Sequence, residues 1–198
     1  FDQFMEENDL YKVAMSNLSD KEILTRFLGA TIPFRIKEDL YTLISFLKNP
    51  LAVRSSSLLE DSYYQPFAGI YRTVMLPNDH EDVEERLRQL VNAVKLVFAS
   101  CFSRQAKGYI KSTPYRIEEE KMAVIIQKVQ GERHDDLFYP TIAGVARSYN
   151  FYPADPAKAE DGVCSVALGM GQMVAEGGEV MRFCPVHPRH GAFWMHPG

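Results

Sequence analysis

A long amphipathic segment, residues 81–102, sets the strongest limit on the fold of this chain. Its apolar residues recur every three or four positions, which predicts a helix with one stripe that other parts of the chain must cover. The stripe contains Val83, Leu87, Leu90, Val91, Val94, Val97 and Phe98. The opposite side carries Glu84, Glu85, Arg88 and Lys95, which we interpret as a solvated face.

The first fifty residues also predict helices. Residues 1–5 place two phenylalanines and a methionine on one helical face. Ser19 followed by Glu22 is a capping box, in which the two side chains satisfy free N–H groups at the start of a helix. A further apolar-periodic segment, 36–47, ends before Pro50 because the residue that precedes a proline disfavours helical geometry.

Other segments have strand character. They are rich in β-branched and apolar residues and cover 51–53, 70–76, 122–126, 141–145 and 163–168. A helical first quarter followed by strands mixed with one long helix predicts an α+β or mixed α/β architecture.

Composition excludes several classes of protein. No apolar run approaches the roughly 20 residues needed to cross a bilayer, and no signal peptide is visible. The 22 Lys+Arg and 26 Asp+Glu give a net charge of −4 without basic blocks, which argues against a nucleic-acid partner. The three cysteines are far apart and form no CxxC pair, so we expect a reducing, cytoplasmic compartment.

The densest polar signal follows the strand at 51–53. Arg54 offers a planar fork of donors that matches phosphate, and three serines after it add hydroxyl groups. The alternative is a serine-rich connection in which Arg54 pairs with Glu60 or Asp61. The residues alone leave both interpretations open.

Three weaker signals lie further along the chain. Glycines at 169–178 would expose N–H groups to an anion, although a plain strand-to-helix turn explains them as well. The strand at 122–129 ends in Gln127, Lys128 and Val129. Their backbone groups would hydrogen-bond to the edge of a purine base; the alternative is a buried strand that simply reaches the surface. Cys184 with His187, His190 and His196 would ligate zinc, but we favour a solvated, proline-rich chain end.

Taken together, these segments resemble the nucleotide-binding region of phosphoenolpyruvate synthase and pyruvate phosphate dikinase. The stretch LAVRSSSLLED (51–61) resembles that family's AVRSSATAED, and Phe67-Ala68-Gly69 resembles its FAGQ. VFASCF (97–102) is similar to its VFASLF, AVIIQKV (123–129) to its strand ending in VQ-x-M, and AGV (143–145) to its SGV. ALGMGQMVAEG (167–177) resembles AWGLGEMVVQG, so the likeness spans nearly the whole chain.

The resemblance implies an α+β ATP-grasp-like fold, in which two lobes with mixed or antiparallel sheets hold ATP between them. We expect the helical region with the first lobe over 1–118 and the second lobe over 119–198. In this family ATP phosphorylates a histidine on a separate domain, which then phosphorylates pyruvate on a third domain. The resemblance implies that Arg54 contacts the ATP phosphates and stabilises the transferring charge, and that Ser55 and Ser56 line the same loop. Gly69 would lie in the hairpin over the phosphates, and Gln127, Lys128 and Val129 would form the adenine-side edge.

Departures from the family pattern leave a second function open. Gln172 stands where the family has the glutamate that the resemblance marks as a Mg²⁺ ligand, so we expect Gln172 or Glu176 near a weakly held Mg²⁺. No counterpart of the family's N-terminal phosphate-binding lysine is visible, and no histidine lies in its phosphohistidine motif. We therefore expect a fragment with an incomplete first lobe, and a non-catalytic nucleotide-binding or regulatory module remains the alternative.

Overall fold

The computed structural model describes residues 1–57, 69–112, 116, 121–171, 173–174, 178–189 and 193–195. The chain forms two compact units, Phe1–Val129 and Gln130–Gly198. Each unit is described here by itself.

Six helices belong to the described part of the first unit. They are α1 (Asp2–Glu7), α2 (Leu10–Met15), α3 (Asp20–Gly29), α4 (Phe34–Phe46), α5 (Val83–Ser100) and α6 (Arg104–Lys111). The expected long helix is α5, and Asp82 begins it by accepting a 3.0 Å hydrogen bond from the Glu84 N–H. The expected capping box at α3 is confirmed, because Ser19 and Glu22 each accept the other's backbone N–H.

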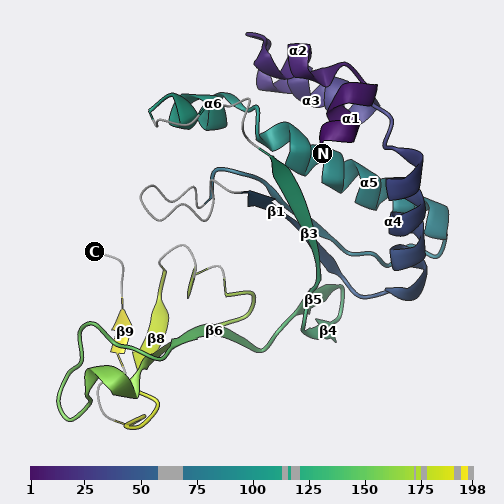
Figure 1. Cartoon of the computed structure of the whole chain (residues 1–198). Coiled ribbons are helices and arrows are strands. Elements are labelled where there is room, and N and C mark those ends of the chain that lie inside the picture. Colours follow the sequence, from purple (N-terminus) through teal and green to yellow (C-terminus); the bar gives the residue numbers. More distant parts are fainter. Residues whose placement is uncertain are drawn as a thin grey trace. The chain divides into compact units, whose positions relative to one another are not determined.

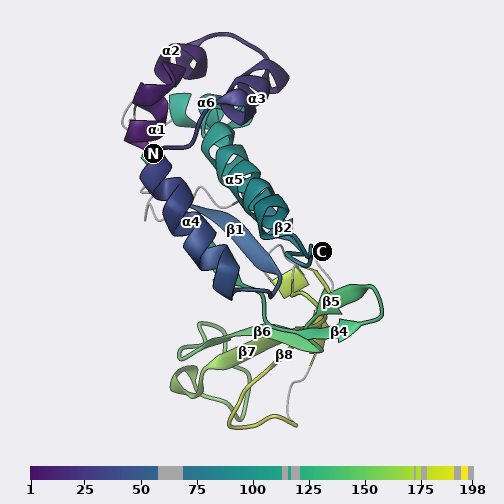
Figure 2. The same cartoon turned by 90° about the vertical axis from the view of Figure 1, so that its right-hand side faces the viewer.

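A three-stranded antiparallel sheet lies beside these helices (Figures 1 and 2). Its order is β2-β1-β3, with β1 (Leu51–Ser57) in the centre, β2 (Thr73–Leu76) and β3 (Met122–Lys128). The helices α4 and α5 cover one face of the sheet (Figure 2). We expected β3 in the second lobe; it pairs along all seven residues of β1, whose backbone groups need a hydrogen-bonding neighbour on both sides.

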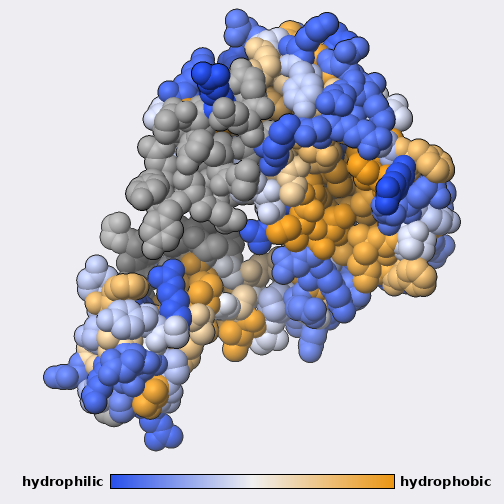
Figure 3. Space-filling view, in the orientation of Figure 1, coloured by the Kyte–Doolittle hydropathy of each residue, from blue (hydrophilic) through white to orange (hydrophobic). Residues whose placement is uncertain are grey.

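The apolar core of the first unit lies between the helices and the sheet. Phe4 packs 5.4 Å from Phe98 and 6.0 Å from Phe27, measured between ring centroids. The core reaches the surface between α4 and β3, where hydrophobic side chains are visible (Figure 3). Half-buried residues also pack on the core. They include Ile36 of α4, Leu47 at the C-terminal end of α4, and Val124 and Ile126 of β3.

One part of the solvated face predicted for α5 is wrong. Lys95 is only 8% exposed, and its ammonium donates a 3.0 Å hydrogen bond to the carbonyl of Leu28 in the last turn of α3. Arg86 is also buried and donates to the carbonyls of Ile44 and Leu47 at the end of α4. Both cations therefore lie against helix C-termini, where carbonyl groups lack partners within the helix.

The described part of the second unit consists mainly of β-strands, with one short 3-10 helix, η2 (Ala159–Asp161). A hairpin of β4 (Glu132–His134) and β5 (Leu137–Tyr139) precedes a four-stranded antiparallel sheet. Its strands follow chain order: β6 (Ile142–Arg147), β7 (Val163–Leu168), β8 (Val180–Phe183) and β9 (Phe193–Met195). Gly144 on β6 has no room for a side chain, because a Cβ there would lie 2.5 Å from the carbonyl oxygen of Ser165.

The strands expected at 141–145 and 163–168 are confirmed as β6 and β7. All three cysteines are free thiols. Among the residues that the structure describes, no helix has the length and apolar character needed to cross a membrane.

Candidate functional site

The face of the three-stranded sheet opposite α4 and α5 carries the strongest polar signal of the sequence. Side chains alternate between the two faces of a strand, and β1 shows this directly. Leu51, Val53, Ser55 and Ser57 are buried on the helix side, whereas Arg54 is exposed on the other side. We call this other side the open face; it is formed by Ala52, Arg54, Ser56, Thr73, Met75, Ala123, Ile125 and Gln127.

Arg54 lies in the middle of the open face. Its neighbours across the sheet are Thr73 on β2 and Ile125 on β3. In an antiparallel sheet, directly paired residues bring their Cβ atoms about 4.5–5.5 Å apart. The register therefore places Arg54 and Thr73 side by side on the open face, with Ser56 two residues further along β1 on the same face.

Among the described residues, none forms an ion pair that would keep the Arg54 side chain from a ligand. The alternative partners Glu60 and Asp61 lie outside the described residues, so pairing with them stays an untested interpretation. The five N–H donors of a guanidinium suit a phosphate group.

Ser55 and Ser56 are separated by the pleat of β1. Ser55 is 4% exposed, faces the helices and pairs across the sheet with Val124. Ser56 is half-buried on the open face and pairs with Ala123. The expected polar loop after residue 53 is instead a continuation of β1 to Ser57, and this explains why only one of the two serines can lie beside Arg54.

The residues expected at the adenine side lie at the end of β3. Gln127 is exposed on the open face and pairs with Ala52 of β1. Ala52 pairs on its other side with Met75 of β2. Lys128 is exposed but belongs to the opposite face, in register with Leu51. The N–H of Val129 donates a 2.8 Å hydrogen bond to the carbonyl of Pro50, so this backbone donor is already used.

Gly69 is described, whereas Phe67 and Ala68 are not. Its φ of +79° is a left-handed conformation that a side chain would strain, so glycine fits this position near the start of β2.

The residues expected to bind metal are largely outside the described part. Gln172 and Glu176 are outside it, as are His190 and His196 of the chain end. The described residues contain no group of three His, Cys, Asp or Glu side chains that could hold a metal ion. At the chain end, the backbone N–H of His187 donates to the carbonyl of Cys184 at 3.2 Å, which is a local turn.

Sequence reasoning did not single out Thr73 and Met75. Both belong to the open face only because β2 pairs with β1 in the observed register. The alternation of polar and apolar residues in 70–76 was a signal for a strand, but its partner and its register were not encoded locally.

The described residues form a three-stranded antiparallel sheet with helices packed on one face, a two-stranded hairpin and a four-stranded antiparallel sheet, and this is an ATP-grasp-like α+β protein. The particular family follows from comparison with family models. The model described as the pyruvate phosphate dikinase AMP/ATP-binding domain matches residues 1–183. The chain belongs to this family, which confirms the resemblance seen in the motifs and makes it a nucleotide-binding domain for ATP or AMP. No curated protein sequence matched the chain.

Proposed function

We propose that this chain is the ATP-binding part of a phosphoenolpyruvate synthase-like phosphotransferase. In this proposal ATP gives a phosphoryl group to a histidine on another domain of the parent protein, and that histidine passes it to pyruvate. The observation that carries the proposal is the place of Arg54, exposed on the open face beside Thr73 and without a described carboxylate partner.

The open face offers two kinds of surface to a nucleotide. Arg54, Thr73 and Ser56 supply hydrogen-bond donors at one end, as a polyphosphate requires. Met75, Ala52 and Gln127 form a row across the three strands at the other end, with two apolar side chains followed by one amide. We assign the phosphates to the first group and the base to the second.

Phosphoryl transfer depends mainly on positioning and on neutralising charge. Arg54 would bind the phosphates and neutralise charge that develops on the transferring group. Ser55 would not contact the phosphates, because its side chain is buried on the helix side. It would support the site by stabilising β1.

Mg²⁺ fits the donor chemistry of the residues assigned to it. The amide oxygen of Gln172 and the carboxylate of Glu176 are hard oxygen ligands of the type that Mg²⁺ prefers. When bound, the ion would offset phosphate charge. With one carboxylate instead of two, we expect weaker metal binding than a pair of glutamates would give.

Calorimetry with Mg-ATP tests the nucleotide site. We expect Arg54→Ala to lower the affinity at least about tenfold, since a charge-assisted hydrogen bond contributes roughly 1.5–3 kcal/mol. Arg35→Ala is the matched control, because Arg35 is an exposed arginine on α4, away from the open face. Equal affinity in Arg54→Ala and the unsubstituted chain would refute the assignment of Arg54.

The substitution of glutamine for glutamate at 172 favours a second function, a nucleotide-binding or regulatory module without catalysis. Incubation of the full-length parent with labelled ATP separates the two functions. The enzyme proposal requires acid-labile label on a histidine of the parent. A parent that binds Mg-ATP weakly, forms no phosphohistidine and regains affinity with Gln172→Glu would support the regulatory module.

A further inference from the structure

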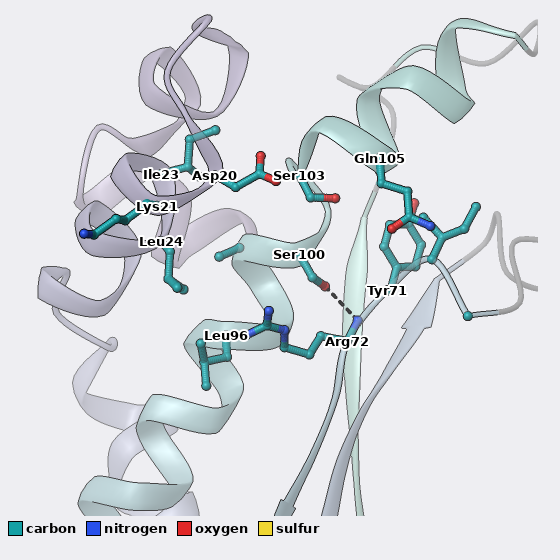
Figure 4. Close-up of a pocket in the computed structure, with 13 residues that line it drawn as sticks. Asp20, Lys21, Ile23, Leu24, Tyr71, Arg72, Leu96, Ser100, Ser103 and Gln105 are labelled. Atoms are coloured by element: carbon teal, nitrogen blue, oxygen red, sulfur yellow. Dashed lines mark hydrogen bonds between the residues drawn. The ribbon is translucent and has the colours of Figure 1, made fainter. Parts of the chain in front are cut away.

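The first unit contains a cavity that is separate from the open face. This cavity, of about 440 Å³, lies between α3, the end of α5 and the residues that lead into β2 (Figure 4). Cavities that bind small molecules in proteins commonly measure about 300–1,000 Å³. None of the open-face residues lines it.

The walls of this cavity are amphipathic. Leu24 of α3 and Leu96 of α5 line it together with Ile70 and the ring of Tyr71. Ser100, Ser103 and Gln105 add hydroxyl and amide groups. Such a lining suits a small molecule with an apolar body and a polar group that sets its orientation.

Arg72 brings a positive charge to the cavity. Its backbone N–H donates a 3.1 Å hydrogen bond to the hydroxyl of Ser100, which holds the main chain against α5. Figure 4 shows its side chain extending from this point toward Leu96. The side chain is exposed, and it makes no ion pair among the described residues.

The carboxylate that lines the cavity does not neutralise Arg72. Asp20 accepts a 2.9 Å hydrogen bond from the N–H of Arg104, at the start of α6. In Figure 4 its carboxylate points toward Ser103 and away from Arg72. Lys21 also lines the cavity, so the described charged groups of the lining are two cations and one acid.

We propose that this cavity binds a small organic anion, with a carboxylate or phosphate group on Arg72 and an apolar body against Leu24 and Leu96 (Figure 4). This cavity is separate from the open face, and Gly69 is the one lining residue that the resemblance also assigns to the nucleotide site. Arg72 and Thr73 are adjacent in the chain, but Thr73 faces the open side of the sheet, whereas Arg72 faces the helix side that this cavity occupies. The two proposed sites therefore use adjacent residues of the chain, Arg72 and Thr73, whose side chains face opposite sides of the sheet.

Titrations of the chain with phenyl phosphate, benzoate and benzyl alcohol test the proposal. These probes share an aromatic ring and differ in charge. We expect the two anions to bind saturably and to shift the NMR signals of Leu24, Leu96 and Ser100, with benzyl alcohol at least about tenfold weaker. Whichever anion binds more tightly identifies the phosphate or the carboxylate as the preferred group.

Variants locate the binding. Arg72→Gln should weaken the anions at least about tenfold, and Leu24→Trp should weaken all three probes by filling the cavity. Arg35→Gln is the control for loss of one exposed positive charge, and thermal unfolding checks that each variant folds. Arg54→Ala should leave anion binding unchanged.

Three results would overturn the proposal: no saturable binding of either anion, equal affinity in Arg72→Gln, or loss of binding in Arg54→Ala instead. The last result would assign the anions to the phosphate end of the open face.

Discussion

Adjacent residues of β1 have opposite environments, and this decides what each can do. Ser55 is buried toward the helices, whereas Arg54 and Ser56 lie on the open face. The two serines, one position apart, therefore have different expected roles: Ser55 in stability and, in our proposal, Ser56 at the nucleotide. The two serines form a matched pair of substitutions.

We expect Ser56→Ala to weaken ATP binding by about 0.5–1.5 kcal/mol, the usual contribution of one hydrogen bond, with little change in stability. Ser55→Ala should instead lower the free energy of unfolding by about 1–3 kcal/mol, because Ser55 is buried and interacts with other groups of the folded chain. Calorimetry and urea unfolding of both variants measure these effects. The opposite outcome, with affinity lost only in Ser55→Ala, would contradict the assignment of the two faces.

At the level of elements, buried cations of α5 connect this helix to the C-terminal ends of α3 and α4. Arg86 donates from one nitrogen to two carbonyls at the end of α4, each at 3.0 Å. Lys95 does the same for one carbonyl at the end of α3. The side of α5 that faces these helix ends is therefore polar but not solvated.

Arg86→Met should lower the free energy of unfolding by roughly 2–4 kcal/mol, because two buried carbonyls lose their donor. Arg88→Met on the same helix is the control. Arg88 is 64% exposed and pairs with Glu85 three residues before it, so its loss should change stability by less than about 0.5 kcal/mol. Urea unfolding of both variants gives the comparison, and equal effects would show that the Arg86 hydrogen bonds contribute little.

Lys95 should make stability depend on pH. Burial lowers the pKa of the Lys95 ammonium below its ordinary value. Between the lowered pKa and the ordinary value of about 10.4, the unfolded chain binds more protons than the folded chain, so stability from this group rises with pH. Lys95→Met lacks this contribution.

Urea unfolding at several pH values from 7 to about 10.4 tests this. The difference in the free energy of unfolding, unsubstituted chain minus Lys95→Met, should increase as the pH approaches the upper limit. A difference that is constant over the range would mean that Lys95 titrates at its ordinary value in the folded chain.

The molecule as a whole consists of two compact units that meet in sequence after Val129. The main cluster of buried apolar residues, from Phe4 to Met122, lies entirely in the first unit. Because β3 completes the sheet of that unit, the boundary of an independently folding piece should lie after β3 and not before it.

A chain of residues 1–129 should therefore unfold cooperatively, whereas residues 1–118 should not, because β1 would lose all seven of its paired residues on one side. Circular dichroism during heating compares the two pieces. Cooperative unfolding of 1–118 would show that β3 is dispensable and would favour the boundary that we expected from the sequence.

Local patterns were sufficient for much of the fold. The period of apolar residues located α5, the capping box began α3, and runs of β-branched residues located β6 and β7. The ordered motifs were sufficient for the family, which matches residues 1–183. These signals are local because helix and strand periods depend on neighbouring positions in the chain.

Tertiary structure decided the rest. The burial of Lys95, the extension of β1 through Ser57 and the meeting of Thr73 with Arg54 all depend on segments that are distant in sequence. Strand register and helix packing are set by contacts between elements, and a shift of one residue exchanges the two faces of a strand. The amino-acid order could therefore indicate that Arg54 and the serines matter, but only strand pairing determined which of them share a surface.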